Sequence, residues 1–105
     1  MVKRWTEANF ATEVSAGEKL VIVDFYSDSC LPCKALSPVL AEVEEAYSDQ
    51  VIVGKVNAVY ERGLVFRWEV ASVPTILFLK NGKEIAQFCG VQRKEELVRE
   101  IEKNL

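Results

Sequence analysis

The chain has 105 residues, of which 50% are hydrophobic and 28% are charged. This is the size of one domain with a single modest core, so we expect one domain over residues 1–105. The formal net charge is −3, and acidic and basic residues are spread along the chain rather than gathered in blocks. Because binding to nucleic acid requires a clustered basic surface, we expect no nucleic-acid partner.

The sequence also lacks the patterns of a membrane or exported protein. The longest aliphatic run, at 20–23, is far shorter than the roughly 20 residues that cross a bilayer. The first residues are charged but are not followed by the apolar stretch of a secretory signal. We therefore expect a cytoplasmic protein, in a compartment where thiols are kept reduced and a lasting disulfide framework does not form. We also expect it to be a monomer.

The first predicted elements are a helix and a buried strand. A cap at Thr6 would begin the helix, Gly17 would end it, and Trp5 would pack against Phe10 as a hydrophobic staple. The segment 20–26 is rich in β-branched and aromatic residues without alternation, which is typical of a strand buried on both faces of a sheet.

Apolar residues then recur at three- and four-residue steps, which predicts an amphipathic helix. They are Leu36, Val39, Leu40, Val43 and Tyr47. Pro38 lies inside this helix and should bend it. A strand at 51–56, a short helix around 60–68 and a strand at 75–79 follow.

The end of the chain predicts a hairpin and a last helix. Asn81-Gly82 is a strong hairpin turn, so 84–89 should return antiparallel to the strand before it. One face of the last helix would carry Leu97, Val98, Ile101 and Leu105. The order of elements predicts an α/β fold with a central mixed sheet flanked by helices on both faces.

Cys30 and Cys33 form a Cys-x-x-Cys pair between the buried strand and the amphipathic helix. Unpaired backbone N–H groups at a helix start stabilise an anion. With Cys30 at the N-cap and Pro32 in the first turn, the N–H of Cys33 is placed to face the Cys30 sulfur. We therefore expect Cys30 to be the nucleophile and Cys33 the thiol that resolves the mixed disulfide.

Three other interpretations of the pair stay open at this point: a structural disulfide, a zinc site and two inert buried cysteines. A reducing compartment would open a disulfide that serves only as a staple. Zinc normally takes four ligands, and the chain has no histidine and only one further cysteine, Cys89. We expect no metal, and no cofactor because the chain has no glycine-rich nucleotide motif.

Six segments, one of which contains the Cys-x-x-Cys pair, carry a family resemblance that covers the chain from Trp5 to Leu105. They are Val23–Tyr26, Cys30–Lys34, Lys55–Asn57, Val73–Thr75, Phe78–Gly82 and Gly90. Through them the sequence resembles the thioredoxin family. The resemblance implies a thioredoxin fold in which Pro74 is cis and packs against the dithiol, a feature that spacing alone does not reveal.

The resemblance also implies roles for residues around the dithiol. Asp24 matches the family's buried acid, whose pKa burial raises and which would accept the Cys33 proton. Lys55 matches the lysine on the neighbouring strand, and a purely structural pairing of Asp24 with Lys55 is the alternative. The residues implied to bind substrate are Leu31, Pro32, Val73, Pro74 and Gly90.

The function implied is a thiol-disulfide oxidoreductase that reduces protein disulfides, maintains cell redox homeostasis and is recharged by a separate flavoprotein reductase. Two alternatives are a disulfide oxidant or isomerase, and a binding or assembly subunit that needs no electron transfer. The chain departs from the family at Ser29 and Leu31, where Trp and Gly are usual, which alters the recognition surface. Tyr26 and Val59 depart likewise, and Asp28 should oppose thiolate formation at Cys30 by its charge.

Three residues outside the motifs are expected to serve packing. Cys89 is interpreted as a small buried hydrophobic residue, with a regulatory thiol as the alternative. Phe66 and Trp68 are interpreted as core residues beneath the helix that covers the sheet.

Overall fold

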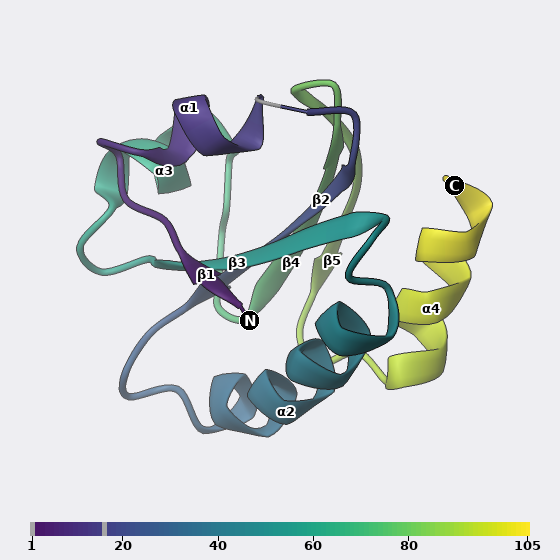
Figure 1. Cartoon of the computed structure of the whole chain (residues 1–105). Helices are drawn as coiled ribbons and strands as arrows, with labels where there is room; N and C mark the ends of the chain where they lie inside the picture. Colours follow the sequence, from purple (N-terminus) through teal and green to yellow (C-terminus); the bar gives the residue numbers. More distant parts are fainter. Residues whose placement is uncertain (1, 16) are drawn as a thin grey trace.

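A mixed five-stranded sheet forms the centre of the structure, a computed structural model that describes residues 2–15 and 17–105 (Figure 1). The strand order is β1-β3-β2-β4-β5; β3 is parallel to β1 and β2, β4 is antiparallel to β2, and β5 is antiparallel to β4. The elements are β1 Lys3–Arg4, α1 Phe10–Val14, β2 Leu20–Tyr26, α2 Leu31–Ala46, β3 Val51–Asn57, α3 Arg62–Arg67, β4 Thr75–Lys80, β5 Lys83–Cys89 and α4 Lys94–Lys103. The predicted fold class is confirmed.

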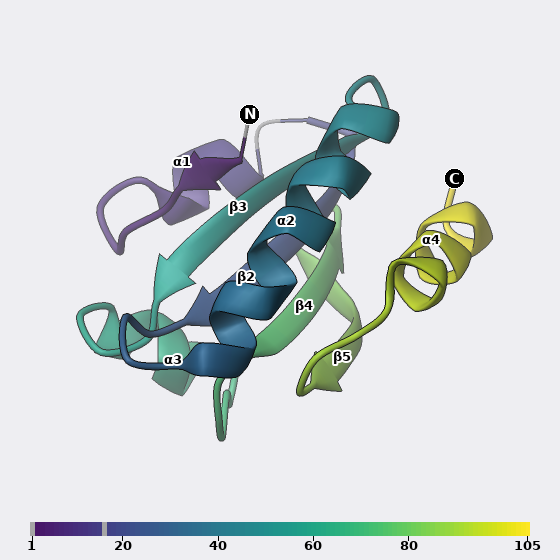
Figure 2. The same cartoon turned by 90° about the horizontal axis from the view of Figure 1, so that it is seen from below.

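The central strand β2 divides the core into two layers, because successive side chains of a strand point to opposite faces. Val21, Val23 and Phe25 pack in the layer beneath α1 and α3. Leu20 and Ile22 pack in the other layer, beneath α2 and α4. Figure 2 shows α2 and α4 on one side of the sheet and α1 and α3 on the other. By the same alternation, Asp24 lies on the α2 side.

The strand β1 was not expected from the sequence. Its two residues pair with Gly54 and Lys55 of β3, and Trp5 continues the pairing through its N–H to the Lys55 carbonyl at 2.9 Å. The Trp5 ring lies so close to Gly54 that a Cβ there would be 2.5 Å from ring carbons. A side chain at position 54 would therefore displace the indole that covers this end of the sheet.

The first helix is shorter than predicted. It begins at Phe10, with Asn9 at the N-cap position, and its C-cap is Ser15. Thr6 does not cap it, because residues 6–9 form a turn in which the Thr6 N–H donates to the Asn9 side chain at 2.8 Å. The predicted contact between Trp5 and Phe10 is confirmed, with ring centroids 5.7 Å apart in an edge-to-face arrangement.

The predicted hairpin is confirmed, and the last helix is confirmed in part. Asn81 and Gly82 both have positive φ values, 53° and 77°, as a tight turn of this kind requires. Leu97 and Ile101 are fully buried against the sheet. Leu105 is 55% exposed, because α4 ends at Lys103 and the last residue leaves the helix face.

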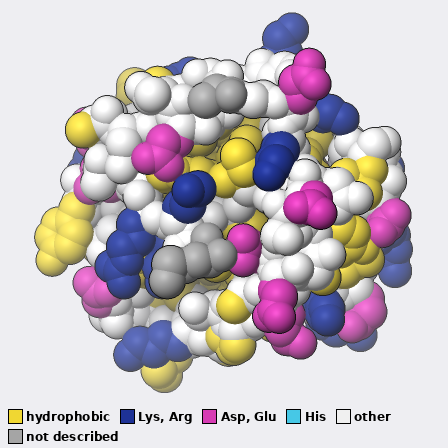
Figure 3. Space-filling model, in the orientation of Figure 1, with side chains coloured by type: hydrophobic (Ala, Val, Ile, Leu, Met, Phe, Trp, Pro, Cys, Tyr) yellow, Lys and Arg dark blue, Asp and Glu magenta, His cyan; other side chains and the backbone are white. Residues whose placement is uncertain are grey.

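Two features concern the surface. In the part of the chain that the structure describes, no helix combines the length and apolar character needed to cross a bilayer. On the face shown in Figure 3, Lys and Arg side chains are interspersed with Asp and Glu rather than gathered by sign.

Candidate functional site

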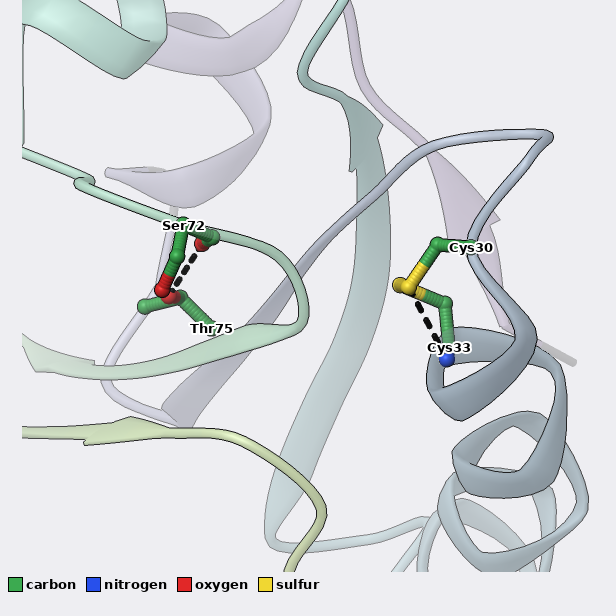
Figure 4. Close-up of a disulfide and its surroundings, with 4 residues drawn as sticks. All are labelled: Cys30, Cys33, Ser72 and Thr75. Carbon is green, nitrogen blue, oxygen red and sulfur yellow. Dashed lines mark hydrogen bonds between the residues drawn. A yellow bond between two sulfur atoms is a disulfide. The ribbon is translucent and has the colours of Figure 1, made fainter.

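The dithiol lies at the start of α2, directly after the loop that leaves β2 (Figure 4). Cys30 and Cys33 are joined in a disulfide, with their Cα atoms 5.3 Å apart. Cys30 is the N-cap residue, its backbone is extended, and its sulfur accepts a hydrogen bond from the Cys33 N–H at 3.1 Å. Pro32 occupies the first turn, where its missing N–H has no partner to lose. The geometry expected for this helix start is confirmed.

The two sulfurs differ in their access to solvent. Cys33 is buried, with 4% of its surface exposed, whereas Cys30 is half-buried. The adjoining Leu31 and Pro32 are exposed. An incoming disulfide can therefore reach the Cys30 sulfur more readily than that of Cys33.

A buried carboxyl group lies behind the dithiol. Asp24 is 3% exposed and faces Lys55 in register across β2 and β3. Asp24, Lys55 and Cys33 line one cavity of about 180 Å3, which also borders Ser37 of α2. The cavity places an acid, a cation and the inner cysteine around one space.

The environment of Asp24 disfavours its charge. Burial raises the pKa of Asp24 from 3.8 to about 7, and the positive charge of Lys55 lowers it by a smaller amount. Among residues 2–15 and 17–105, none donates a hydrogen bond to Oδ1 of Asp24. The carboxyl group therefore changes charge near neutral pH, where it can take up or release a proton.

Lys55 acts on Asp24 through space. Its Nζ lies 5.3 Å from the centroid of the Tyr26 ring, a cation–π arrangement. The described residues contain no direct ion pair between Lys55 and Asp24. Lys55 therefore acts on the charge of Asp24 at a distance rather than through a direct ion pair.

The loop before β4 completes the edge of the sheet at which β2 ends. The Val73–Pro74 peptide bond is cis, as the resemblance implied. Thr75, which follows, pairs with Phe25 of β2, and its hydroxyl donates to the Ser72 carbonyl at 2.6 Å (Figure 4). The Gly90 N–H donates to the Pro74 carbonyl at 2.8 Å. Pro74 is buried, while Val73 and Gly90 are partly accessible.

Asn57 links the loop between β2 and α2 to the loop that follows β3, a contact that the sequence analysis missed. Its Nδ2 donates to Oδ2 of Asp28 at 3.3 Å, and its Oδ1 accepts the Val59 N–H at 2.9 Å. Asn57 is the last residue of β3, at the carboxyl end of a buried parallel strand. A short polar side chain at that place is the sequence feature that could have revealed it.

The interpretation of Cys89 as a buried residue is wrong, because the side chain is exposed. It lies on β5, an edge strand, opposite Thr75 of β4. Its sulfur is 4.0 Å from the Thr75 hydroxyl oxygen. Cys89 is thus an accessible thiol near the cis-proline loop.

The interpretation of Phe66 as a core residue is also wrong, because its side chain is 86% exposed. The helix α3 has six residues, and Leu64 and Val65 occupy its inward face. Trp68 packs partly buried against the core, as expected, and its ring stacks with Arg67.

The residues that the structure describes contain no group of three or more His, Cys, Asp or Glu placed to hold a metal ion.

Comparison with known proteins gives one family. The family model for thioredoxin matches residues 1–103. A thioredoxin of Alicyclobacillus acidocaldarius subsp. acidocaldarius is 38% identical over 92 residues, 88% of this chain and 87% of that protein. A thioredoxin of Chlamydia caviae is 38% identical over 101 residues, 96% of each chain. A thioredoxin of Chlorobaculum thiosulfatiphilum is 31% identical over 100 residues, 95% of this chain and 93% of that protein.

Proposed function

The chain belongs to the thioredoxin family, and we propose that within it the chain is a reductase of protein disulfides whose nucleophile is Cys30 and whose resolving thiol is Cys33. The family and the bonded Cys-x-x-Cys pair support thiol-disulfide oxidoreductase chemistry and do not favour the alternative of a subunit without electron transfer. The observation that carries the proposal is the contact of the Cys33 N–H with the sulfur of the more accessible Cys30. That N–H would stabilise a thiolate at Cys30.

In the first step, the Cys30 thiolate attacks one sulfur of a substrate disulfide. A mixed disulfide forms, and the other substrate sulfur leaves as a thiolate. In the second step, Cys33 loses its proton and attacks the Cys30 sulfur. The Cys30–Cys33 disulfide forms and the second substrate thiol is released, so two electrons pass from the dithiol to the substrate.

We assign the proton of Cys33 to Asp24. Both residues line the same cavity, and the pKa of Asp24, which burial raises to about 7, suits a group that accepts a proton near neutral pH. Lys55 stabilises the charged carboxylate from the neighbouring strand and is a positioning residue. Removing the acid should slow the second step and leave the first unchanged.

The substrate is proposed to lie over Leu31, Pro32, Val73, Pro74 and Gly90. The support is the accessibility of Leu31, Pro32, Val73 and Gly90 and the hydrogen bond that ties Gly90 to the buried Pro74. The backbone groups of Val73 would pair with an extended substrate segment. Because main-chain pairing is independent of side chains, it would admit many substrate sequences.

Four finer proposals concern the setting: a single domain, a monomer, a cytoplasmic location and recharging by a separate flavoprotein reductase. The accessible free thiol of Cys89 suits a compartment that keeps thiols reduced. Fractionation of the source cells tests the cytoplasmic location. Reduction of the oxidised chain by a purified flavoprotein reductase tests the recharging.

The function is tested by insulin reduction with dithiothreitol, using Cys33→Ser in a Cys89→Ser background. The double variant should accumulate a stable mixed disulfide through Cys30, and Cys89→Ser alone should keep full activity. Full turnover by the Cys33→Ser variant would contradict the two-cysteine cycle. Equilibration with glutathione then separates a reductant from an oxidant or isomerase.

A further inference from the structure

Three of the most exposed large apolar side chains belong to the short stretch that leads into and forms α3. Val59 is 59%, Tyr60 72% and Phe66 86% exposed. The core does not require them, because Leu64 and Val65 fill the inward face of the helix and are 6% and 8% exposed. Apolar side chains gathered on one exposed segment are typical of an interaction surface.

Two hollows run along this stretch, with volumes of about 250 and 490 Å3. Ser27 and Val73 are among the residues that line the first, and Phe66 is among those that line the second. Arg62 and Val65 line both, so the hollows adjoin. We call them together the α3 groove.

The near end of the α3 groove lies at the dithiol. The Ser27 carbonyl accepts a hydrogen bond from the Cys30 N–H at 3.3 Å. Val73, which also lines the first hollow, is the residue before the cis peptide bond to Pro74. A substrate bound with its disulfide at Cys30 would therefore have its flanking residues at the mouth of the groove.

Two arginines give the groove its charge. Arg62 is held in place because its Nη1 donates to the Ala58 carbonyl at 2.8 Å, and within residues 2–15 and 17–105 its other donors make no further hydrogen bond. Arg67 is stacked on the Trp68 ring, with its guanidinium carbon 4.8 Å from the ring centroid. Glu69 is the acidic residue in the lining, so the two arginines leave the groove with a positive balance.

The acids next to α3 are engaged elsewhere. The Glu61 carboxylate accepts the Glu7 N–H at 2.9 Å, and the Glu7 carboxylate accepts the Gly63 N–H at the helix start, also at 2.9 Å. These two carboxylates accept backbone hydrogen bonds and form no ion pair with Arg62 or Arg67 within the described chain.

From this arrangement we infer that the α3 groove selects disulfide substrates whose segment beside the reacting cysteine carries aliphatic or aromatic residues interleaved with Asp or Glu. The inference rests on the proposed function and specifies its substrate class. The exposed side chains of Phe66 and Val59 contact the apolar side chains, and Arg62 and Arg67 contact the carboxylates. The occupant is a segment of the protein substrate, seated only while its disulfide is at Cys30.

Two synthetic peptides test this. Both carry the same internal disulfide and the same flanking Leu and Phe residues; one has two Glu between them, and the other has two Lys. The chain should reduce the Glu peptide with a kcat/KM about 5- to 10-fold higher, as expected for two partly exposed ion pairs. The difference should lie in KM, because the groove binds the substrate equally before and during the reaction.

Variants identify the groove. Arg62→Glu should abolish or reverse the preference between the peptides, Arg62→Lys should keep most of it, and Phe66→Ser should raise KM for both. The controls are Arg99→Glu on α4 and Leu105→Ser, which changes another exposed apolar side chain at the chain end; both should have no effect. Thermal melting checks that each variant is folded.

A small disulfide without carboxylates, 4,4′-dithiodipyridine, separates this inference from the proposed function. It reaches Cys30 without occupying the groove, so all variants should reduce it at the wild-type rate. Equal kcat/KM for the two peptides, with normal reduction of the small disulfide, would overturn the inference alone. Failure to reduce the small disulfide would overturn the proposed function. A dimer in sedimentation that Phe66→Ser dissociates would also overturn the inference, since a second copy would then cover the groove.

Discussion

Asp24 and Lys55 face each other in register across the central strands β2 and β3, at the wall of the cavity that Cys33 also lines. Without this cation and this cavity, the carboxyl group of Asp24 would have only apolar neighbours in its layer of the core. Its pKa, raised to about 7 by burial and lowered in smaller part by Lys55, makes both stability and reactivity sensitive to pH in the neutral range.

The first prediction is that Asp24→Asn stabilises the fold at pH 8. Between about pH 4 and 7 the unfolded chain releases the Asp24 proton while the folded chain keeps it, so stability falls as pH rises through that window. Above it, the cost of the buried charge is on the order of 4 kcal/mol, an upper value. Urea unfolding should show a large gain at pH 8 and little at pH 4. Asp49→Asn, at an exposed position, should give no such difference.

The second prediction is that Lys55→Gln raises the pKa of Asp24 above about 7, because the lysine charge lowers it in the native chain. Carbon-13 NMR of the side-chain carboxyl group measures this titration directly. If Asp24 accepts the Cys33 proton, the pH at which the resolving step reaches half its maximum rate should rise by the same amount. Lys83→Gln, at the hairpin, serves as control, and an unmoved titration would contradict the electrostatic role.

The third prediction concerns Gly54 and the Trp5 ring. Gly54→Ala would place a Cβ 2.5 Å from the indole, and the ring fills the core, so the variant should lose about 1–3 kcal/mol of stability. Gly17→Ala is the matched control, because a Cβ there meets nothing nearer than 4.0 Å. Equal melting temperatures for the two variants would show that the indole has room to move.

The fourth prediction is that the oxidised chain has one reactive thiol. Of three cysteines, two form the disulfide and Cys89 is exposed, so a folded oxidised sample should bind one equivalent of a maleimide without denaturant. Cys89→Ser should bind none. If the maleimide labels Cys89 only after the chain is unfolded, Cys89 is buried and the exposed position is wrong.

The sequence predicts the elements that repeat a pattern and misses those set by contacts between distant segments. The buried run of β2 and the turn at Asn81-Gly82 are local patterns, and both are confirmed. The strand β1 has two residues and exists because Trp5 and Gly54 pack together, a contact that no local pattern reveals.

The same distinction holds at the site. The spacing of Cys30 and Cys33 predicts the helix start and its N–H contact, and the burial of Asp24 follows from an acid inside an apolar strand. The link from Asn57 to Asp28 joins residues 29 positions apart, and the only sequence feature that points to it is the polar side chain at the end of β3. The exposure of Cys89 follows from the edge position of β5, which depends on the order of strands in the sheet rather than on the residues around it.

The pairing between β4 and β5 is offset after Phe78, where Ala86 and then Glu84 are the successive partners, so Ile85 is an extra residue in the edge strand. An irregularity of this kind twists the strand and interrupts the row of outward N–H and C=O groups. Lys83 and Glu84 lie beside this irregularity. A strand from another molecule would therefore meet an edge with charged side chains and interrupted hydrogen-bonding groups. The β5 edge of the sheet is thereby protected against the edge-to-edge association that leads to aggregates.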